Sequence, residues 1–184
     1  MSEGIEVRES RPEDVRFAPE ASKLIELVAE EYDIATRTPA WIAAKIQARR
    51  AALAIDSSGA EPELVGFGYW SAWGNDLFVS HSGLVVHPER MGLGLGSRLK
   101  EVVFRSSERQ LPEATMMSLT NSPQVKALNE RLGFRVVPLE RLTNDPAFWK
   151  GCETCRSFAE VQQRGLRCCC EGMIRPPGGW PDDA

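Results

Sequence analysis

Three glycines alternate with larger residues in the stretch 91–96, which reads MGLGLG and leads directly into an apolar-periodic segment. Glycine destabilises regular structure, because it has more backbone freedom to lose on folding than other residues. Glycines just before a helix let an anion approach main-chain N–H groups, where the helix dipole also favours negative charge. The stretch is therefore a candidate cradle for a pyrophosphate group.

Other glycine-loop interpretations fit this stretch less well. A dinucleotide fingerprint, G-x-G-x-x-G, requires a third glycine where Ser97 stands, and it requires a later acidic residue at a suitable spacing. A P-loop requires a lysine directly after its last glycine, and none follows Gly96. A plain tight turn into a helix does not need three glycines.

The elements around the glycines predict a mixed α/β domain. A β-meander occupies the middle of the chain, and β-α-β units follow it. We expect strands at 4–10, 51–56, 63–73, 77–86, 114–120 and 134–138, and helices at 11–35, 36–50, 94–110 and 122–132.

Composition restricts the class of protein. The chain has 184 residues, with 22 basic and 26 acidic side chains, a net charge of −4 and no long basic run, which argues against general nucleic-acid binding. The first residues lack the features of a secretory signal, and no apolar run approaches the ~20 residues of a membrane helix. We therefore expect a cytoplasmic protein without a membrane partner. A homodimer is left open.

Two motifs resemble segments of a known family. LVVHPERMGLGLGSRL resembles the acetyl-CoA binding motif of the GNAT superfamily of N-acyltransferases, and SPQVKALNERLGF resembles the segment that follows it there. The resemblance covers about residues 4–138. It implies a mixed central sheet whose fourth and fifth strands are splayed, with helices on both faces, and acetyl-CoA bound in the gap.

By this resemblance, Leu84, Val85 and Val86 would contact the pantetheine arm and the thioester. The pyrophosphate would be held by the main-chain N–H groups of the next segment: Met91, Gly92, Leu93, Gly94, Leu95, Gly96 and Ser97.

The chain departs from the family pattern at three positions. Met91 occupies the Arg or Gln slot, with Arg90 one residue earlier, and Ser122 occupies an Asn slot of the cofactor site, with Asn121 one residue earlier. Asn129 stands where the family usually has a tyrosine that protonates the leaving thiolate, and asparagine is not a comparable acid. The thiolate must then take its proton from another source, and this departure favours a non-catalytic acetyl-CoA sensor as the alternative function.

Acetyl transfer by direct attack in a ternary complex requires a base for the acceptor amine, because an ammonium group has no lone pair. His81 is the first candidate, because its ordinary pKa lies in the useful range. Neighbouring strand residues face opposite sides, so Ser80 and His81 cannot both line the gap. Weaker candidates precede the second helix: Glu30, Glu31 and Asp33.

The acceptor is suggested by a narrower resemblance. The pattern IATRTP…SGLVV…LGF…DPAFWKGCETC is similar to small bacterial GNAT proteins linked to arginine biosynthesis, whose presumed role is to acylate the α-amine of glutamate. Arg37 and Thr38 would then bind an acidic amino acid, with Arg37 gripping its carboxylate. A solvated arginine at a helix end is the plainer interpretation of Arg37, and protein or peptide N-acetylation is a further alternative.

All five cysteines follow residue 150. In a cytoplasmic protein free or metal-bound cysteines are favoured over disulfides, and a redox dithiol, a disulfide or buried free thiols are the alternatives to a metal site. A C-x2-C pair followed by two more thiols has a spacing that structural zinc accepts, which gives as ligands Cys152, Cys155, Cys168 and Cys170, with Cys169 turned away on an extended segment. We therefore divide the chain into an acetyltransferase domain at 1–140, a Cys-rich extension at 141–175 packed on the core, and a flexible tail at 176–184.

Overall fold

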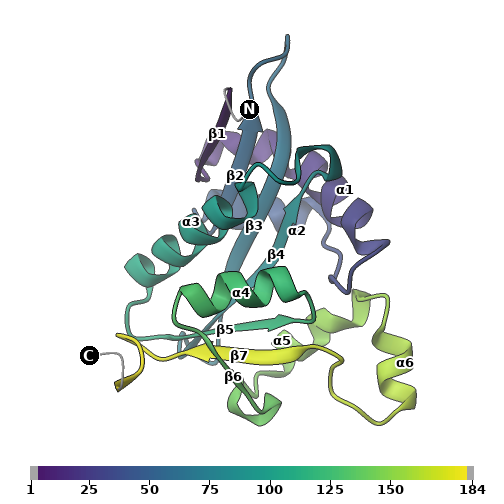
Figure 1. Cartoon of the computed structure of the whole chain (residues 1–184), viewed down its shortest axis with the longest axis vertical. Coiled ribbons are helices and arrows are strands. Elements are labelled where there is room, and N and C mark those ends of the chain that lie inside the picture. The colour runs from purple at the N-terminus through teal and green to yellow at the C-terminus, as the bar shows by residue number, and fades with distance from the viewer. Residues whose placement is uncertain (1–3, 182–184) are drawn as a thin grey trace.

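A computed structural model describes residues 4–181 and contains a mixed sheet covered by helices (Figure 1). The strands are β1 Ile5–Glu9, β2 Ala51–Asp56, β3 Glu63–Trp73, β4 Phe78–Val86, β5 Thr115–Thr120, β6 Arg135–Val137 and β7 Glu171–Arg175. The helices are α1 Ala18–Ala29, α2 Pro39–Gln47, α3 Leu95–Gln110, α4 Pro123–Arg131, α5 Pro146–Lys150 and α6 Phe158–Gln163.

The sheet has the strand order β1-β2-β3-β4-β5-β7-β6, and β4 and β5 form its parallel pair. Pairing between these two strands is confined to Phe78–Ser80 against Thr115–Met117. Beyond that point the strands diverge: in Figure 1 the first four run nearly upright, while β5 and β7 lie across the lower half. The predicted mixed sheet with splayed fourth and fifth strands is confirmed.

Helices cover both faces of the sheet, as predicted. Because successive side chains of a strand alternate between faces, Leu53 and Phe67 pack with α1 and α2, while Ala52 and Trp70 pack with α3. Both aromatic side chains are fully buried. These two apolar layers fix the first four strands between the helices and thereby hold β4 in place.

The expected helix at 11–35 is shorter in the structure. A 3-10 segment at Pro12–Phe17 precedes α1, and the chain leaves the helix after Ala29. The expected helix at 36–50 begins at Pro39, because the Thr38 hydroxyl accepts a hydrogen bond from the Trp41 N–H and caps it. Residues 30–38 thus form a loop without regular structure, here called the α1–α2 loop.

The strand β7 was not predicted from the sequence. It lies inside the sheet and pairs antiparallel with both β5 and β6. Met173 packs with Phe134 on one face, and Ile174 packs with Phe148 of α5 on the other. The boundary suggested at residue 140 therefore falls between β6 and β7, two neighbouring strands of one sheet.

The last described residues are anchored by an aromatic side chain. The indole N–H of Trp180 donates a hydrogen bond to the Gly133 carbonyl at 3.0 Å. The rest of the tail that the sequence predicted to be flexible, 182–184, lies outside the described residues. Within 4–181, no helix combines the length and the apolar character needed to cross a bilayer.

Candidate active site

A cleft of about 610 Å³ opens where β4 and β5 diverge. Its walls come from β4, β5, the start of α3, α4 and the α1–α2 loop. Most of the residues predicted to bind the cofactor line it: Leu84, Val85, Val86, Met91, Gly92, Gly94, Leu95, Gly96, Ser97 and Ser122. Leu93 does not line the cleft and packs instead on the hydrophobic cluster beneath α3.

The glycine loop needs its glycines for backbone conformation. Gly92 and Gly94 have φ values of +81° and +72°, which side-chain-bearing residues rarely adopt, although a Cβ at either position would meet nothing within 4 Å. Gly94 precedes α3 and supplies no side-chain cap, so the first N–H groups of that helix remain suited to an anion. Arg90, one residue before the family's Arg or Gln slot, lines the cleft and forms an ion pair with Asp56 at 3.1 Å.

A bulge interrupts β4 at the wall of the cleft. Two residues, Gly83 and Leu84, lie opposite the single residue Gly68 of β3. Gly83 has a φ of +60°, and a Cβ there would lie 2.3 Å from Cε1 of Tyr69. A bulge leaves main-chain groups of its strand unpaired, and an unpaired N–H beside a bound thioester can polarise the carbonyl.

His81 lines the cleft and is only 5% exposed. Its Nε2 lies 2.8 Å from the Ser107 hydroxyl, which also lies 2.9 Å from the Phe104 carbonyl; when the hydroxyl donates to that carbonyl, Nε2 is the protonated ring nitrogen. Its Nδ1 has no hydrogen-bond partner in the described part of the chain. Burial, with a smaller effect from Lys100, lowers the pKa of His81 well below 6.5. The side chain is therefore a neutral imidazole with one free acceptor atom.

The other two predicted catalytic residues lie outside the lining of the cleft. Ser80 is on the opposite face from His81, where its hydroxyl accepts a hydrogen bond from the Trp73 indole at 2.8 Å. Asn129 is fully buried, and its side-chain amide donates to the Met173 sulfur at 3.4 Å. Through these contacts both side chains take part in packing around the sheet, and neither faces the cleft.

Lys100 is a residue of the cleft that sequence reasoning missed. It is only 3% exposed, and its Nζ lies 5.0 Å from the centroid of the Phe134 ring. Burial lowers the pKa of Lys100 to about 7. The sequence position could have indicated that Lys100 faces the cleft, because Lys100 follows Gly96 by four residues and so lies on the same face of the helix.

The two predicted acceptor-binding residues, Arg37 and Thr38, do not line the cleft. The Arg37 guanidinium donates to the Gly151 carbonyl at 3.0 Å and to the Thr154 hydroxyl at 3.2 Å. Thr38 caps α2. Nη1 of Arg37 holds the segment after α5, so Arg37 is not a free surface arginine, and its role as a carboxylate clamp stays a prediction.

Asp33 lines the cleft from the α1–α2 loop and accepts three side-chain hydrogen bonds from nitrogen and oxygen donors, besides a contact with the Cys169 thiol at 3.9 Å. The donors are Arg156 at 3.1 Å, the Ser157 hydroxyl and the Asn121 amide. Although burial opposes ionisation, these hydrogen bonds lower the pKa of Asp33. The carboxylate therefore joins three segments of the chain and is poorly suited to act as a base.

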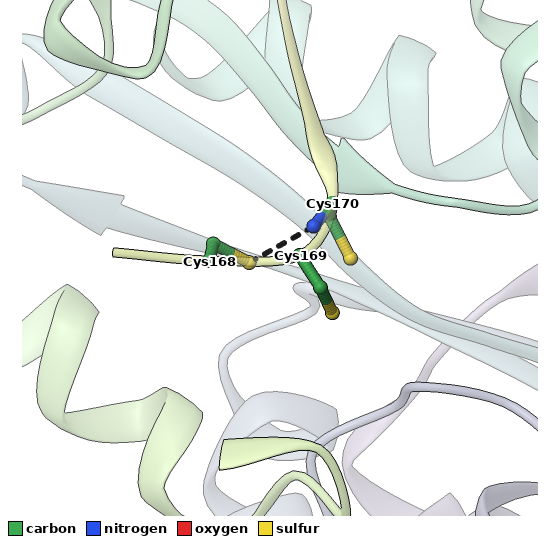
Figure 2. Close-up of side chains that lie close together, drawn as sticks. All are labelled: Cys168, Cys169 and Cys170. Atoms are coloured by element: carbon green, nitrogen blue, oxygen red, sulfur yellow. Dashed lines mark hydrogen bonds between the residues drawn. The ribbon is translucent and has the colours of Figure 1, made fainter. Parts of the chain in front are cut away.

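Three of the five cysteines form the tightest group, and the zinc set of Cys152, Cys155, Cys168 and Cys170 stays a prediction. The sulfur atoms of Cys168, Cys169 and Cys170 all lie within 4.8 Å of one another, and Cys152 and Cys155 are outside this group. Cys152 is nevertheless a neighbour of the group, because burial and then the nearby Cys168 raise the pKa of its thiol to about 11. Figure 2 shows the Cys169 and Cys170 side chains pointing to the same side. The expectation that Cys169 turns away was wrong, because the chain bends at 169 and 170 and strand alternation does not apply.

The strand order, the gap between β4 and β5 and the glycine loop at α3 define the fold of the GNAT acetyltransferases. No family model matches the chain, and no curated protein matches it. Three similar solved structures show the same fold at low identity.

N-acetylglutamate synthase from Neisseria gonorrhoeae, solved with coenzyme A and N-acetyl-glutamate, has a TM-score of 0.65 and 15% identity over 94% of this chain. The chain spans 35% of that protein's length. Rv2747 from Mycobacterium tuberculosis, solved with CoA, has a TM-score of 0.64 and 16% identity over 92% of this chain and 97% of its own. A phosphinothricin acetyltransferase from Sinorhizobium meliloti, solved with AcCoA, has a TM-score of 0.59 and 19% identity over 97% of both chains.

Proposed function

We propose that this protein is an acetyl-CoA-dependent N-acetyltransferase that acts on a small amine, with glutamate or a similar amino acid as the first acceptor to test. The observation that carries the proposal is the continuity of the cleft with the glycine loop. The pyrophosphate of coenzyme A would bind at the start of α3, and the pantetheine arm would extend between β4 and β5. The Neisseria and Mycobacterium structures, both solved with coenzyme A, support this placement.

In the proposed reaction the neutral acceptor amine attacks the thioester directly. A main-chain N–H left unpaired by the bulge near Gly83 would polarise the carbonyl. The adduct then releases a proton from nitrogen and expels the thiolate of coenzyme A. We assign the first proton to His81, because this residue lines the cleft and its Nδ1 lacks a hydrogen-bond partner within the described residues.

We assign protonation of the thiolate to Lys100. This residue lies in the cleft, whereas Asn129, in the family's tyrosine position, does not. Burial gives Lys100 a pKa of about 7, so that near neutral pH its ammonium and amine forms are both populated. A general acid works best when its pKa is near the operating pH.

Release of coenzyme A tests the proposal. The protein is mixed with acetyl-CoA and a panel of amines that includes glutamate, other amino acids, polyamines and a peptide N-terminus. Coenzyme A and the acetylated product are quantified by chromatography, because the five free cysteines of the chain would react with a thiol reagent. Turnover with at least one small amine is expected, and tight acetyl-CoA binding without turnover across the panel would favour the sensor.

The role of Lys100 is tested with two variants that change the same position differently. Lys100→Met is expected to lower kcat by about 10²-fold or more while leaving KM for acetyl-CoA nearly unchanged, as for loss of a general acid. Lys100→Arg keeps the positive charge but cannot release a proton near neutral pH. If Lys100→Arg retains full kcat, the residue acts through its charge and not as an acid.

A further inference from the structure

Three consecutive cysteines bring their sulfur atoms together immediately before β7. All three Sγ atoms of Cys168, Cys169 and Cys170 lie within 4.8 Å of one another, and the Cys170 N–H donates to the Cys168 sulfur at 3.4 Å (Figure 2). Around a tetrahedral zinc ion with Zn–S bonds of about 2.3 Å, sulfur atoms are about 3.8 Å apart. The observed cluster therefore needs to contract by about 1 Å at most to surround one ion.

The cluster lies beside the α1–α2 loop. The Cys169 sulfur is 3.9 Å from Oδ2 of Asp33, the residue that also accepts hydrogen bonds from Arg156 and Asn121. Arg156 pairs with the Asp33 carboxylate at 3.1 Å and so offsets a negative charge beside a site that would itself be net negative with three thiolates and one divalent ion. A tetrahedral ion also has a fourth position, which water or the neighbouring carboxylate of Asp33 can fill.

Disulfide formation is a poor alternative for neighbouring residues in this cluster. The Cα atoms of sequence neighbours are about 3.8 Å apart, below the usual range of about 4.4–6.8 Å for bridged cysteines. Soft thiolate ligands select thiophilic ions such as Zn²⁺ over Mg²⁺ or Ca²⁺. For the two adjacent pairs the donor set therefore favours a thiolate metal site, and a disulfide between Cys168 and Cys170 is the alternative that metal binding by the reduced protein tests.

We propose that Cys168, Cys169 and Cys170 bind one Zn²⁺ ion through their sulfur atoms beside Asp33. Each thiol that becomes a ligand loses its proton to solvent, and no electron is transferred. The ion would fix the segment before β7 against the α1–α2 loop, at the edge of the cleft. The site does not depend on the proposed transferase activity, because metal binding is measured without turnover.

Metal titration of the full chain tests this site. The reduced protein is stripped of metal with a chelator and titrated with Zn²⁺ and, separately, with Co²⁺. We expect about one tightly bound equivalent and, with Co²⁺, tetrahedral d–d bands together with sulfur-to-metal charge-transfer absorption sized for three thiolates. X-ray absorption of the zinc-loaded wild type should give the same sulfur count, which keeps the test independent of any variant.

The variants assign the ligands. At saturating Co²⁺, Cys169→Ser is expected to lose about one third of the charge-transfer absorption and to weaken Zn²⁺ binding at least about 10-fold, with circular dichroism confirming that it folds. The matched control is Cys152→Ser, which should bind one equivalent as the wild type does. Binding well below one equivalent in the wild type would overturn the site. Loss of binding in Cys152→Ser, or full retention in Cys169→Ser, would overturn the assignment to these three cysteines.

Discussion

Replacing Lys100 with methionine should change the pH dependence of folding stability in a defined window. The pKa of this lysine falls from 10.5 to about 7 on burial. At about 1.36 kcal/mol per pH unit, this fall is equivalent to about 5 kcal/mol. Between these two values the unfolded chain binds a proton that the native protein does not, so the contribution of Lys100 to stability rises with pH across the window.

The Lys100→Met variant has no such proton to exchange. Below pH 7 it should be more stable than the wild type by up to about 5 kcal/mol, because the native wild type holds a buried ammonium group there. The difference should shrink steadily and vanish near pH 10. Comparing the two proteins removes the contributions of cysteines and tyrosines that also titrate at alkaline pH.

Urea denaturation followed by circular dichroism at a series of pH values from 6 to 10 measures this difference. The matched control is Lys23→Met, since Lys23 is an exposed lysine on α1 and lies outside the cleft. Its stability should run parallel to that of the wild type at every pH. Parallel curves for Lys100→Met and the wild type would refute the buried, proton-releasing state of Lys100, and with it the acid role that we assign.

Three other substitutions probe the site. Gly94→Ala requires a residue with a side chain to adopt a φ of +72° in the loop that binds the pyrophosphate, which costs about 1–2 kcal/mol of conformational energy. If that cost falls on the binding conformation, coenzyme A should bind about 5- to 30-fold more weakly by calorimetry. The control Gly59→Ala, in the turn after β2, should not change binding. Gly83→Ala would place a Cβ 2.3 Å from the Tyr69 ring. It should lower the free energy of unfolding by about 3 kcal/mol in thermal denaturation. An unchanged stability would refute the tight packing at the bulge. Arg37→Met should lower stability by about 1–2 kcal/mol without raising KM for the acceptor, and a large rise in that KM would restore Arg37 as a substrate ligand.

The parts of the fold that sequence predicted well are those with local signals. The glycines before α3 and the apolar spacing within it placed the helix within one residue of its observed start at Leu95. The alternation of β4 correctly separated Ser80 from His81, because each strand residue faces the side opposite its neighbour.

The parts that sequence missed depend on contacts between distant segments. The five residues of β7 carry no strong strand pattern, and pairing with β5 and β6 is what makes them a strand. In the sequence Lys100 looks like an ordinary polar residue of a helix. Phe134, which packs against it, comes 34 residues later, after α4. The Cys169 sulfur lies close to those of Cys168 and Cys170 because the chain bends there, and no residue pattern in the sequence predicts that bend.

The central position of β7 also has a consequence for synthesis of the protein. During translation β5 and β6 leave the ribosome well before Glu171–Arg175, yet neither strand pairs with the other in the finished sheet. Until those residues emerge, one edge of β5 and the apolar surface under α4 stay open, a state that invites chaperones or self-association. The lower half of the sheet must therefore close late, through contacts that are distant in sequence and slow to form.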